Sequence, residues 1–151
     1  MSGDTVDAMT DRRLAIAAWE SLFRAQHELM EELAVDFSAD GDLSQAEYDV
    51  LLTVTRGEDG SARLRDVTSN MLISQPSVSR LVDRMVSRGL LTKCPDPSDG
   101  RGAIVRATEE GAAAFRRVAT VHGRTISQRM SVLSDDELAQ LKAITAKLRG
   151  V

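Results

Sequence analysis

The chain has 151 residues, a length typical of one domain that buries its own core. Its single cysteine excludes an internal disulfide, and no apolar run is long enough to span a membrane or to form a signal-peptide core. The net charge of −4 is unevenly spread: residues 61–106 hold eight basic and four acidic side chains, whereas residues 1–60 hold four basic and fourteen acidic ones. We therefore expect a cytoplasmic protein with no membrane partner, whose basic middle segment binds an anionic partner such as nucleic acid.

The first predicted element is a long helix over residues 10–37, capped by Thr10 or Asp11 and preceded by a disordered tail at residues 1–9. Its larger apolar residues recur at helical spacing and form broad stripes; they are Leu14, Trp19, Leu22, Phe23, Leu29, Met30, Leu33 and Phe37. This is more apolar surface than one small core covers. We therefore expect the helix to pack against a partner helix from a second subunit.

A helix-turn-helix is predicted next. A capping box formed by Ser44 and Glu47 begins one helix, and the glycine-rich turn at residues 57–60 ends it. Arg63 is predicted to lie in a very short strand that joins a later hairpin. Residues 64–72 then form a short helix, which a tight link joins to the helix that follows.

The helix after this link divides cleanly into two faces. Residues 74–85 predict a helix with Ser74 as its N-cap and Pro76 in the first turn, where a missing N–H costs nothing. One face carries apolar residues at offsets of three and four, namely Val78, Leu81, Val82 and Met85. The other face is polar and basic. A DNA recognition helix needs this division, because one face seats it in a core while the other contacts base edges and phosphates.

A β-hairpin with a basic tip is predicted after Gly89, which caps the preceding helix. It consists of a strand over residues 90–94, a turn-rich loop over 95–102 and a returning strand over 103–108. A helix-turn-helix followed by such a hairpin is a winged helix.

Two further helices complete the chain. Thr108 caps a long helix over residues 109–133, and a capping box of Ser134 and Glu137 begins the last helix. The predicted fold is mainly α with a small β-hairpin wing, in the order α-α-(β)-α-α-β-β-α-α, within a single domain.

With these residues in this order, the chain resembles the MarR family of winged-helix transcriptional regulators. The resemblance covers residues 10–150 and rests on five segments, of which the wing segment 96–101 and the segment 108–111 after it are the most specific; the others are 43–51, 79–85 and 88–90. It implies a homodimer built by helices within residues 10–37 and 109–150, with a DNA-binding region at 43–108. It also implies a pseudo-palindromic operator, with each recognition helix in a major groove and each wing near a minor groove. Many relatives bind small aromatic or phenolic molecules that weaken their DNA affinity.

The chain departs from the family pattern at three places. Leu72 stands where many relatives have glycine in the turn before the recognition helix, and Thr68 stands where a small alanine is common. Both changes affect how the two helices pack. Gly100 occupies the middle of the wing tip and offers no cation, which removes one phosphate contact.

The candidate DNA-binding residues lie in the recognition helix and the wing. In the helix they are Ser74, Gln75, Pro76, Ser77, Ser79, Arg80 and Arg84. Alternatively, the serines are caps or solvent-facing residues, and the arginines pair with Asp83 or Asp66. In the wing the candidates are Asp99, Gly100 and Arg101, with Asp99 positioning Arg101 for a minor groove. Alternatively, Arg101 forms an ion pair within the wing.

A small-molecule pocket and a sensing residue are weaker hypotheses. Trp19, Phe23, His27 and Tyr48 combine flat apolar groups with polar tips, as an aromatic ligand requires. Alternatively, they form a dimer-interface or core stripe. His27 and His122 titrate near neutral pH, meet across an interface or are structural. Cys94 is a redox sensor or a small strand side chain.

Enzyme function is not expected, because the chain has no nucleophile elbow, phosphate-cradling loop or metal-ligand spacing, so we expect no catalytic residues, metal or cofactor. We predict a homodimeric, sequence-specific DNA-binding regulator, a repressor released by a small aromatic or phenolic ligand. The acidic N-terminal helix and the neutral Gly100 leave one alternative open: a winged-helix module that binds another protein and not DNA.

Overall fold

The structure is a computed structural model that describes residues 3–37, 42–72 and 77–151. It divides into two compact units, residues 1–35 and residues 36–151. The first unit is essentially one helix, α1 (Gly3–Leu33). The helix begins at Gly3 and not near Thr10, so residues 3–9 are helical where a disordered tail was expected. Neither proline nor glycine occurs between residues 4 and 10, so no helix-breaking residue interrupts the backbone there.

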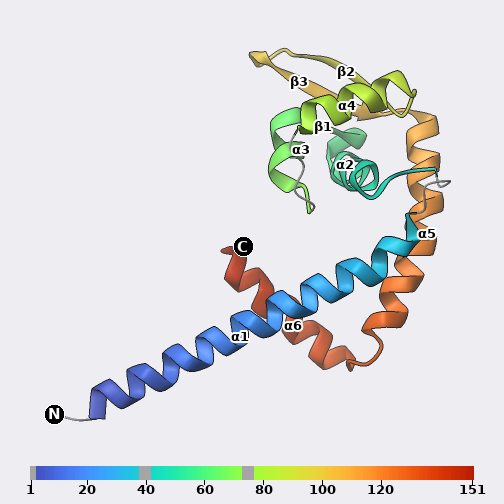
Figure 1. Cartoon of the computed structure of the whole chain (residues 1–151). Helices are drawn as coiled ribbons and strands as arrows, with labels where there is room; N and C mark the ends of the chain where they lie inside the picture. Colours follow the sequence, from blue (N-terminus) through green and yellow to red (C-terminus); the bar gives the residue numbers. More distant parts are fainter. Residues whose placement is uncertain (1–2, 38–41, 73–76) are drawn as a thin grey trace. The chain divides into compact units, whose positions relative to one another are not determined.

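The second unit contains the remaining helices and the only sheet of the described residues. Its elements are η1 (Ala34–Asp36, which begins in the first unit), α2 (Gln45–Arg56), η2 (Glu58–Gly60), β1 (Ser61–Arg63), α3 (Leu64–Asn70), α4 (Val78–Ser87), β2 (Leu91–Asp96), β3 (Asp99–Ala107), α5 (Glu109–Met130) and α6 (Asp135–Arg149). Figure 1 shows α2, α3 and α4 grouped with the strands, while α5 leads away from this group to α6. The order agrees with the predicted winged helix. No helix among the described residues is long and apolar enough to cross a bilayer.

The sheet has three antiparallel strands in the order β1-β3-β2. The short strand predicted at Arg63 is confirmed, because Arg63 pairs with Ile104 of β3. The hairpin strands are longer than expected, so the predicted loop at 95–102 shrinks to a turn at residues 97 and 98. Two features explain the longer strands: β2 is an edge strand that tolerates Pro95, and the side chain of Asp96 closes the turn.

Local capping signals define most helix ends. The capping boxes at Ser44 and Ser134 are both complete, and Thr108 accepts the backbone N–H of Gly111 at 3.0 Å. Gly89 has a φ of 78° after α4, in the left-handed region that a residue at this position of a helix end commonly adopts. Leu90 and Gly89 donate back to the carbonyls of Met85 and Val86, each at 3.0 Å, which completes a Schellman motif.

The core of the second unit lies between the helix-turn-helix and the sheet. Its fully buried larger side chains come from α2, α3, α4 and the strands, with Leu43 just before α2; they are Leu43, Val50, Leu51, Val54, Val67, Val82, Met85, Leu91 and Val105. The apolar face predicted for the recognition helix is therefore buried as a whole, because Val78 and Leu81 are buried as well. Burying this face orients the opposite face of α4 outward.

One buried carboxylate holds the residue that follows the end of α3. Asp49 of α2 is only 2% exposed, and its Oδ2 accepts the backbone N–H of Leu72 at 2.6 Å. Leu72 is the last described residue before the link to α4, and its side chain is exposed. The hydrogen bond therefore attaches the end of the α3 segment to α2.

Candidate nucleic-acid interface

The recognition helix begins later than the sequence suggested. Ser77 is the N-cap of α4, and its hydroxyl accepts the backbone N–H of Arg80 at 3.3 Å. The expected cap at Ser74 is therefore wrong, because the helix begins at Val78, where its buried stripe also begins. The alternative reading of Ser77 as a cap agrees with this geometry. The predicted contacts Ser74, Gln75 and Pro76 lie outside the described residues.

The outer face of α4 carries two free cations. Ser79, Arg80 and Arg84 are all exposed. The alternative in which the arginines pair with Asp83 or Asp66 is not what the structure contains, since Asp83 pairs instead with Lys93 of β2 at 2.9 Å. Over the ranges 42–72 and 77–151, neither Arg80 nor Arg84 forms an ion pair. Their guanidinium groups are therefore available to an external acceptor.

The wing tip presents one exposed arginine. Asp99 accepts the backbone N–H of Arg101 through Oδ1 at 3.1 Å, which fixes the backbone from which the Arg101 side chain extends. Gly100 is also exposed, and a Cβ added there would meet nothing within 4 Å. Asp99 therefore holds the backbone of Arg101, while the Arg101 side chain stays exposed. The Asp83–Lys93 pair joins this hairpin to α4, so the two candidate DNA-contacting elements are physically linked.

Asp96 anchors the base of the wing, a role that sequence reasoning missed. Asp96 is only 5% exposed. Its carboxylate accepts the backbone N–H of Ser98 at 2.9 Å and the Ser98 hydroxyl at 2.7 Å. It also pairs with Arg63 of β1 at 3.2 Å. The hydrogen bonds from Ser98 lower the pKa of Asp96 below its ordinary value, and the charge of Arg63 acts in the same direction. An aspartate two residues before a serine is a turn signal, but its pairing with Arg63 depends on the tertiary fold.

Replacing Asp96 with asparagine is expected to destabilise the protein at neutral pH and to do so less at low pH. Because the native pKa lies below the ordinary 3.8, Asp96 stabilises the fold above that pH and loses this effect as pH falls through the native pKa. Urea unfolding of wild type and Asp96→Asn between pH 2 and pH 7 checks this. A stability difference that stays constant across that range contradicts the assigned role of the charge.

A second ionic network holds the far end of the recognition helix. Arg88, the C-cap of α4, pairs with Glu47 and donates to the carbonyl of Asp42 at 3.1 Å. The Asp42 carboxylate in turn pairs with Arg117 of α5 at 2.8 Å. Glu47 thus serves both its capping box and Arg88, and the hydrogen bond from Arg88 raises the pKa of that guanidinium. This network connects α5, the start of α2 and the end of α4.

The four residues proposed for a ligand pocket belong to two different units: Trp19, Phe23 and His27 to the first, and Tyr48 to the second. Trp19 and Phe23 stack on α1 with ring centroids 5.6 Å apart, and with His27 they line a shallow, exposed hollow of that helix. His27 lies 3.5 Å from Glu31. Tyr48 belongs to a different cluster in the second unit. The pocket and the interface surface therefore both stay predictions for these residues.

The cluster around Tyr48 is aromatic and half-buried. Tyr48 stacks on Phe115 of α5 at 5.1 Å, and both Tyr48 and Phe37 contact the His122 ring edge-on or tilted. Burial raises the pKa of Tyr48 above its ordinary value. The Nδ1 of His122 lies 2.8 Å from Asp36, which also accepts the hydroxyl of Thr125 at 3.0 Å. These contacts hold the His122 ring within the second unit, in agreement with the structural alternative.

The remaining candidate sensor is a cysteine of the wing. Cys94 lies exposed on β2. Among the described residues, no group of three or more His, Cys, Asp or Glu side chains is arranged to hold a metal ion.

Comparison with known proteins points to one family. Residues 41–102 match the model of the MarR family. The chain is 26% identical over 127 residues to the uncharacterized HTH-type transcriptional regulator YkoM of Bacillus subtilis, covering 83% of this chain and 80% of that protein. It is similar to the crystal structure of AbsC, a MarR family transcriptional regulator from Streptomyces coelicolor, with a TM-score of 0.73 and 25% identity over 89% of this chain and 94% of AbsC.

A further solved structure shares the fold. Sco3205, a MarR family transcriptional regulator from Streptomyces coelicolor crystallised in complex with DNA, has a TM-score of 0.76 and 22% identity, covering 88% of this chain and 84% of that one. These relatives are regulators and not enzymes, in agreement with the sequence-based expectation. The helix-turn-helix and wing within residues 41–102 match the MarR family model, and the chain is similar in fold to solved MarR family transcriptional regulators.

Proposed function

We propose that this protein is a transcriptional regulator of the MarR family that binds duplex DNA sequence-specifically through α4 and the wing. The observation that carries the proposal is the outward face of α4, where the exposed Arg80 and Arg84 have no ion-pair partner in the described residues. An arginine-tipped hairpin is attached to this helix through Asp83 and Lys93. An arginine on such a helix can contact guanine bidentately, and an arginine at a wing tip fits a narrow minor groove. The DNA complex of the structurally similar Sco3205 supports the same use of the fold.

We propose that the functional form is a homodimer on a pseudo-palindromic operator. In the single chain, α1 leaves large apolar side chains exposed, including Leu14, Trp19 and Phe23, and α6 leaves Ile144 and Leu148 exposed. Apolar surface of this extent on helices is typical of an interface. A second copy of the chain is the partner that covers it. Two-fold symmetry then presents two recognition helices, which explains why the operator would be palindromic.

The proposed outcome of DNA binding is repression, relieved by a small aromatic or phenolic molecule. This part follows from the family resemblance. A ligand relieves repression only if it binds the DNA-free conformation more tightly than the DNA-bound one. The stacked Trp19 and Phe23 on α1 and the cluster around Tyr48 are separate candidate contacts for such a ligand.

Replacing Arg80 or Arg101 with alanine is expected to weaken operator binding in different ways. Arg80→Ala removes a base contact, so it costs about 1–3 kcal/mol and relaxes sequence preference. Arg101→Ala weakens binding while the dimer stays intact, because Arg101 is exposed and is not one of the apolar side chains of α1 and α6 proposed for the interface. Fluorescence anisotropy with DNA from upstream of the chain's own gene measures both effects.

Two controls make this test decisive. Arg124→Ala removes an exposed cation from α5 and is expected to leave operator affinity unchanged. Gly100→Lys adds a cation at the wing tip, where nothing lies within 4 Å, and is expected to strengthen binding. Wild-type affinity in both Arg80→Ala and Arg101→Ala contradicts the proposed roles. If gel shifts find no specific complex at any salt concentration, the alternative of a protein-binding module is supported instead.

A further inference from the structure

A hollow of about 280 Å³ lies between α3 and the wing, and arginines from three elements line it. They are Arg63 of β1, Arg65 of α3 and Arg101 of β3. Because β1 pairs with β3, the residues that directly follow β1 lie beside this strand of the wing. Arg65 belongs to neither α4 nor the wing, the two elements proposed to bind DNA. The hollow therefore adds a cation from a third element to the surface that carries the wing arginine.

The two carboxylates of the hollow already have partners within the protein. Asp96 pairs with Arg63 at 3.2 Å, so the charge of Arg63 is used there. Asp99 accepts the backbone N–H of Arg101 at 3.1 Å. Within residues 42–72 and 77–151, the guanidinium groups of Arg65 and Arg101 form no ion pair, and both residues are exposed. These two cations are therefore available to an external anion.

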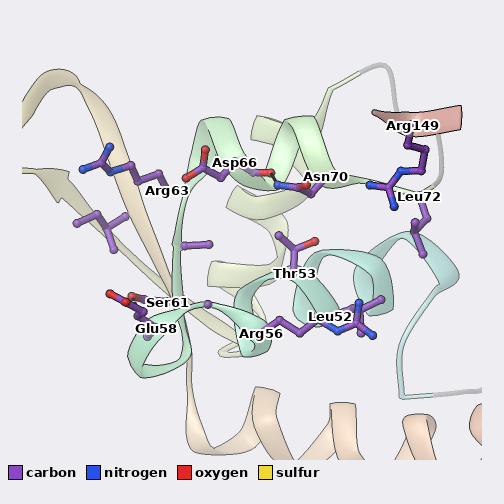
Figure 2. Close-up of a pocket in the computed structure, with 13 residues that line it drawn as sticks. Leu52, Thr53, Arg56, Glu58, Ser61, Arg63, Asp66, Asn70, Leu72 and Arg149 are labelled. Atoms are coloured by element: carbon purple, nitrogen blue, oxygen red, sulfur yellow. Dashed lines mark hydrogen bonds between the residues drawn. The ribbon is translucent and has the colours of Figure 1, made fainter. Parts of the chain in front are cut away.

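The neighbouring carboxylate of α3 faces a different site. Asp66 lines a separate cleft of about 640 Å³ between α2, α3, β1 and the end of α6, together with Arg56 and Arg149. Figure 2 shows Asp66 on α3 among the residues of this cleft. Arg65 is not one of them and lines the hollow beside the wing instead. Consecutive residues of α3 thus present an anion to one site and a cation to the other, so Asp66 does not neutralise Arg65.

The place of Arg65 suits a phosphate at the edge of a minor groove. An arginine at a wing tip fits a narrow minor groove, where the negative potential is concentrated. The minor groove of DNA is about 6 Å wide, so the phosphates that border it lie within a side chain's length of such an arginine. Since Arg65 and Arg101 line one hollow, a duplex that seats Arg101 in its groove brings a bordering phosphate to Arg65. Thr68 adds no donor, because its hydroxyl donates to the carbonyl of Leu64 at 3.0 Å.

We propose that the hollow between α3 and the wing seats a backbone phosphate of the bound duplex, held by Arg65. The inference rests on the proposed DNA-binding function and extends it to a third element of the winged helix. Its partner is the DNA strand that borders the minor groove at Arg101, once in each half-site. Phosphate contacts fix the register of a protein on the duplex but do not read bases. Arg65 therefore sets affinity, whereas α4 sets sequence preference.

The test is fluorescence anisotropy of the full chain across a salt series, with DNA from upstream of its own gene and with a scrambled duplex of equal length and composition. Arg65→Ala removes one phosphate contact from each protomer, so the slope of log affinity against log salt falls in magnitude by about 1.8 for the dimer. At about 100 mM salt, both duplexes are expected to bind about tenfold more weakly or worse. The preference for the operator over the scrambled duplex stays at the wild-type value, in contrast to Arg80→Ala.

Two variants control for the charge and for its place. Arg65→Lys keeps a cation in the hollow and is expected to keep the wild-type slope, because an ammonium also neutralises a phosphate. Arg56→Ala removes an exposed arginine from the other cleft and is expected to leave the slope unchanged. Urea unfolding of Arg65→Ala is expected to match that of wild type, since the exposed side chain forms no ion pair in the described residues. A loss of DNA affinity is then not a loss of folded protein.

The outcomes separate this contact from DNA binding as such. A wild-type slope in Arg65→Ala overturns the contact, and so does an equal loss of slope in Arg56→Ala, which would be a general effect of charge. A loss confined to the operator overturns the assignment to a phosphate, because it makes Arg65 a reader of bases. If wild type forms no specific complex, the DNA-binding function and the contact both fail. A specific complex with an unchanged slope in Arg65→Ala overturns the contact alone.

Discussion

Operator affinity is expected to fall by about 10³–10⁵-fold when the salt concentration rises from 50 to 200 mM, if the dimer contacts about 6–10 phosphates. The physical reason is the release of counterions from DNA when arginines neutralise its phosphates. The overall charge of −4 does not oppose this, because the basic side chains concentrate in residues 61–106. Fluorescence anisotropy across a salt series at constant pH gives the slope of log affinity against log salt.

The wing arginine provides an internal check on this slope. If Arg101 contacts one phosphate in each half-site, Arg101→Ala lowers the magnitude of the slope by about 2 for the dimer. Gly100→Lys raises it, because it adds a cation at the same tip. An affinity that does not respond to salt would show that phosphate contacts are not the basis of binding.

Replacing Gly111 with alanine is expected to destabilise the protein by about 1–3 kcal/mol or more, through steric overlap. Gly111 lies in the first turn of α5, and a Cβ there would stand 2.0 Å from the carbonyl oxygen of Leu90. That carbonyl also accepts the N–H of Thr108 at 3.1 Å, so a hydrogen bond holds it in place. Backbone cannot rotate away as a flexible side chain can. For the alanine side chain to fit, the first turn of α5 would have to move away from Leu90, which follows α4.

The same helix contains a matched control. Gly123 is exposed, and nothing lies within 4 Å of a Cβ built there. Gly123→Ala is therefore expected to stabilise the protein by up to about 1 kcal/mol, because alanine is the better helix former. Urea unfolding midpoints of the two variants should move in opposite directions from wild type. A Gly111→Ala protein as stable as wild type would contradict the close packing of α5 on Leu90.

Short-range features were predictable because they depend on residues three or four positions apart. The predicted caps are confirmed for three helix starts and one helix end: the capping boxes at Ser44 and Ser134, the N-cap at Thr108, and Gly89 after the C-terminal end of α4. The start of the recognition helix was less certain in the sequence, because residues 74–77 offer two serines as caps. Packing of Val78 into the core selects Ser77.

The sequence by itself determined the winged-helix order, the buried stripe of α4 and the exposed arginines opposite it, because helical periodicity places those residues on two faces. Only the tertiary structure decided which distant side chains meet. Arg88 reaches Glu47 across 41 positions, and His122 reaches Asp36 across 86. The cleft between α2, α3, β1 and the end of α6 likewise has no local signature. Periodicity repeats within one element, whereas these contacts depend on how separate elements pack, which no short segment encodes.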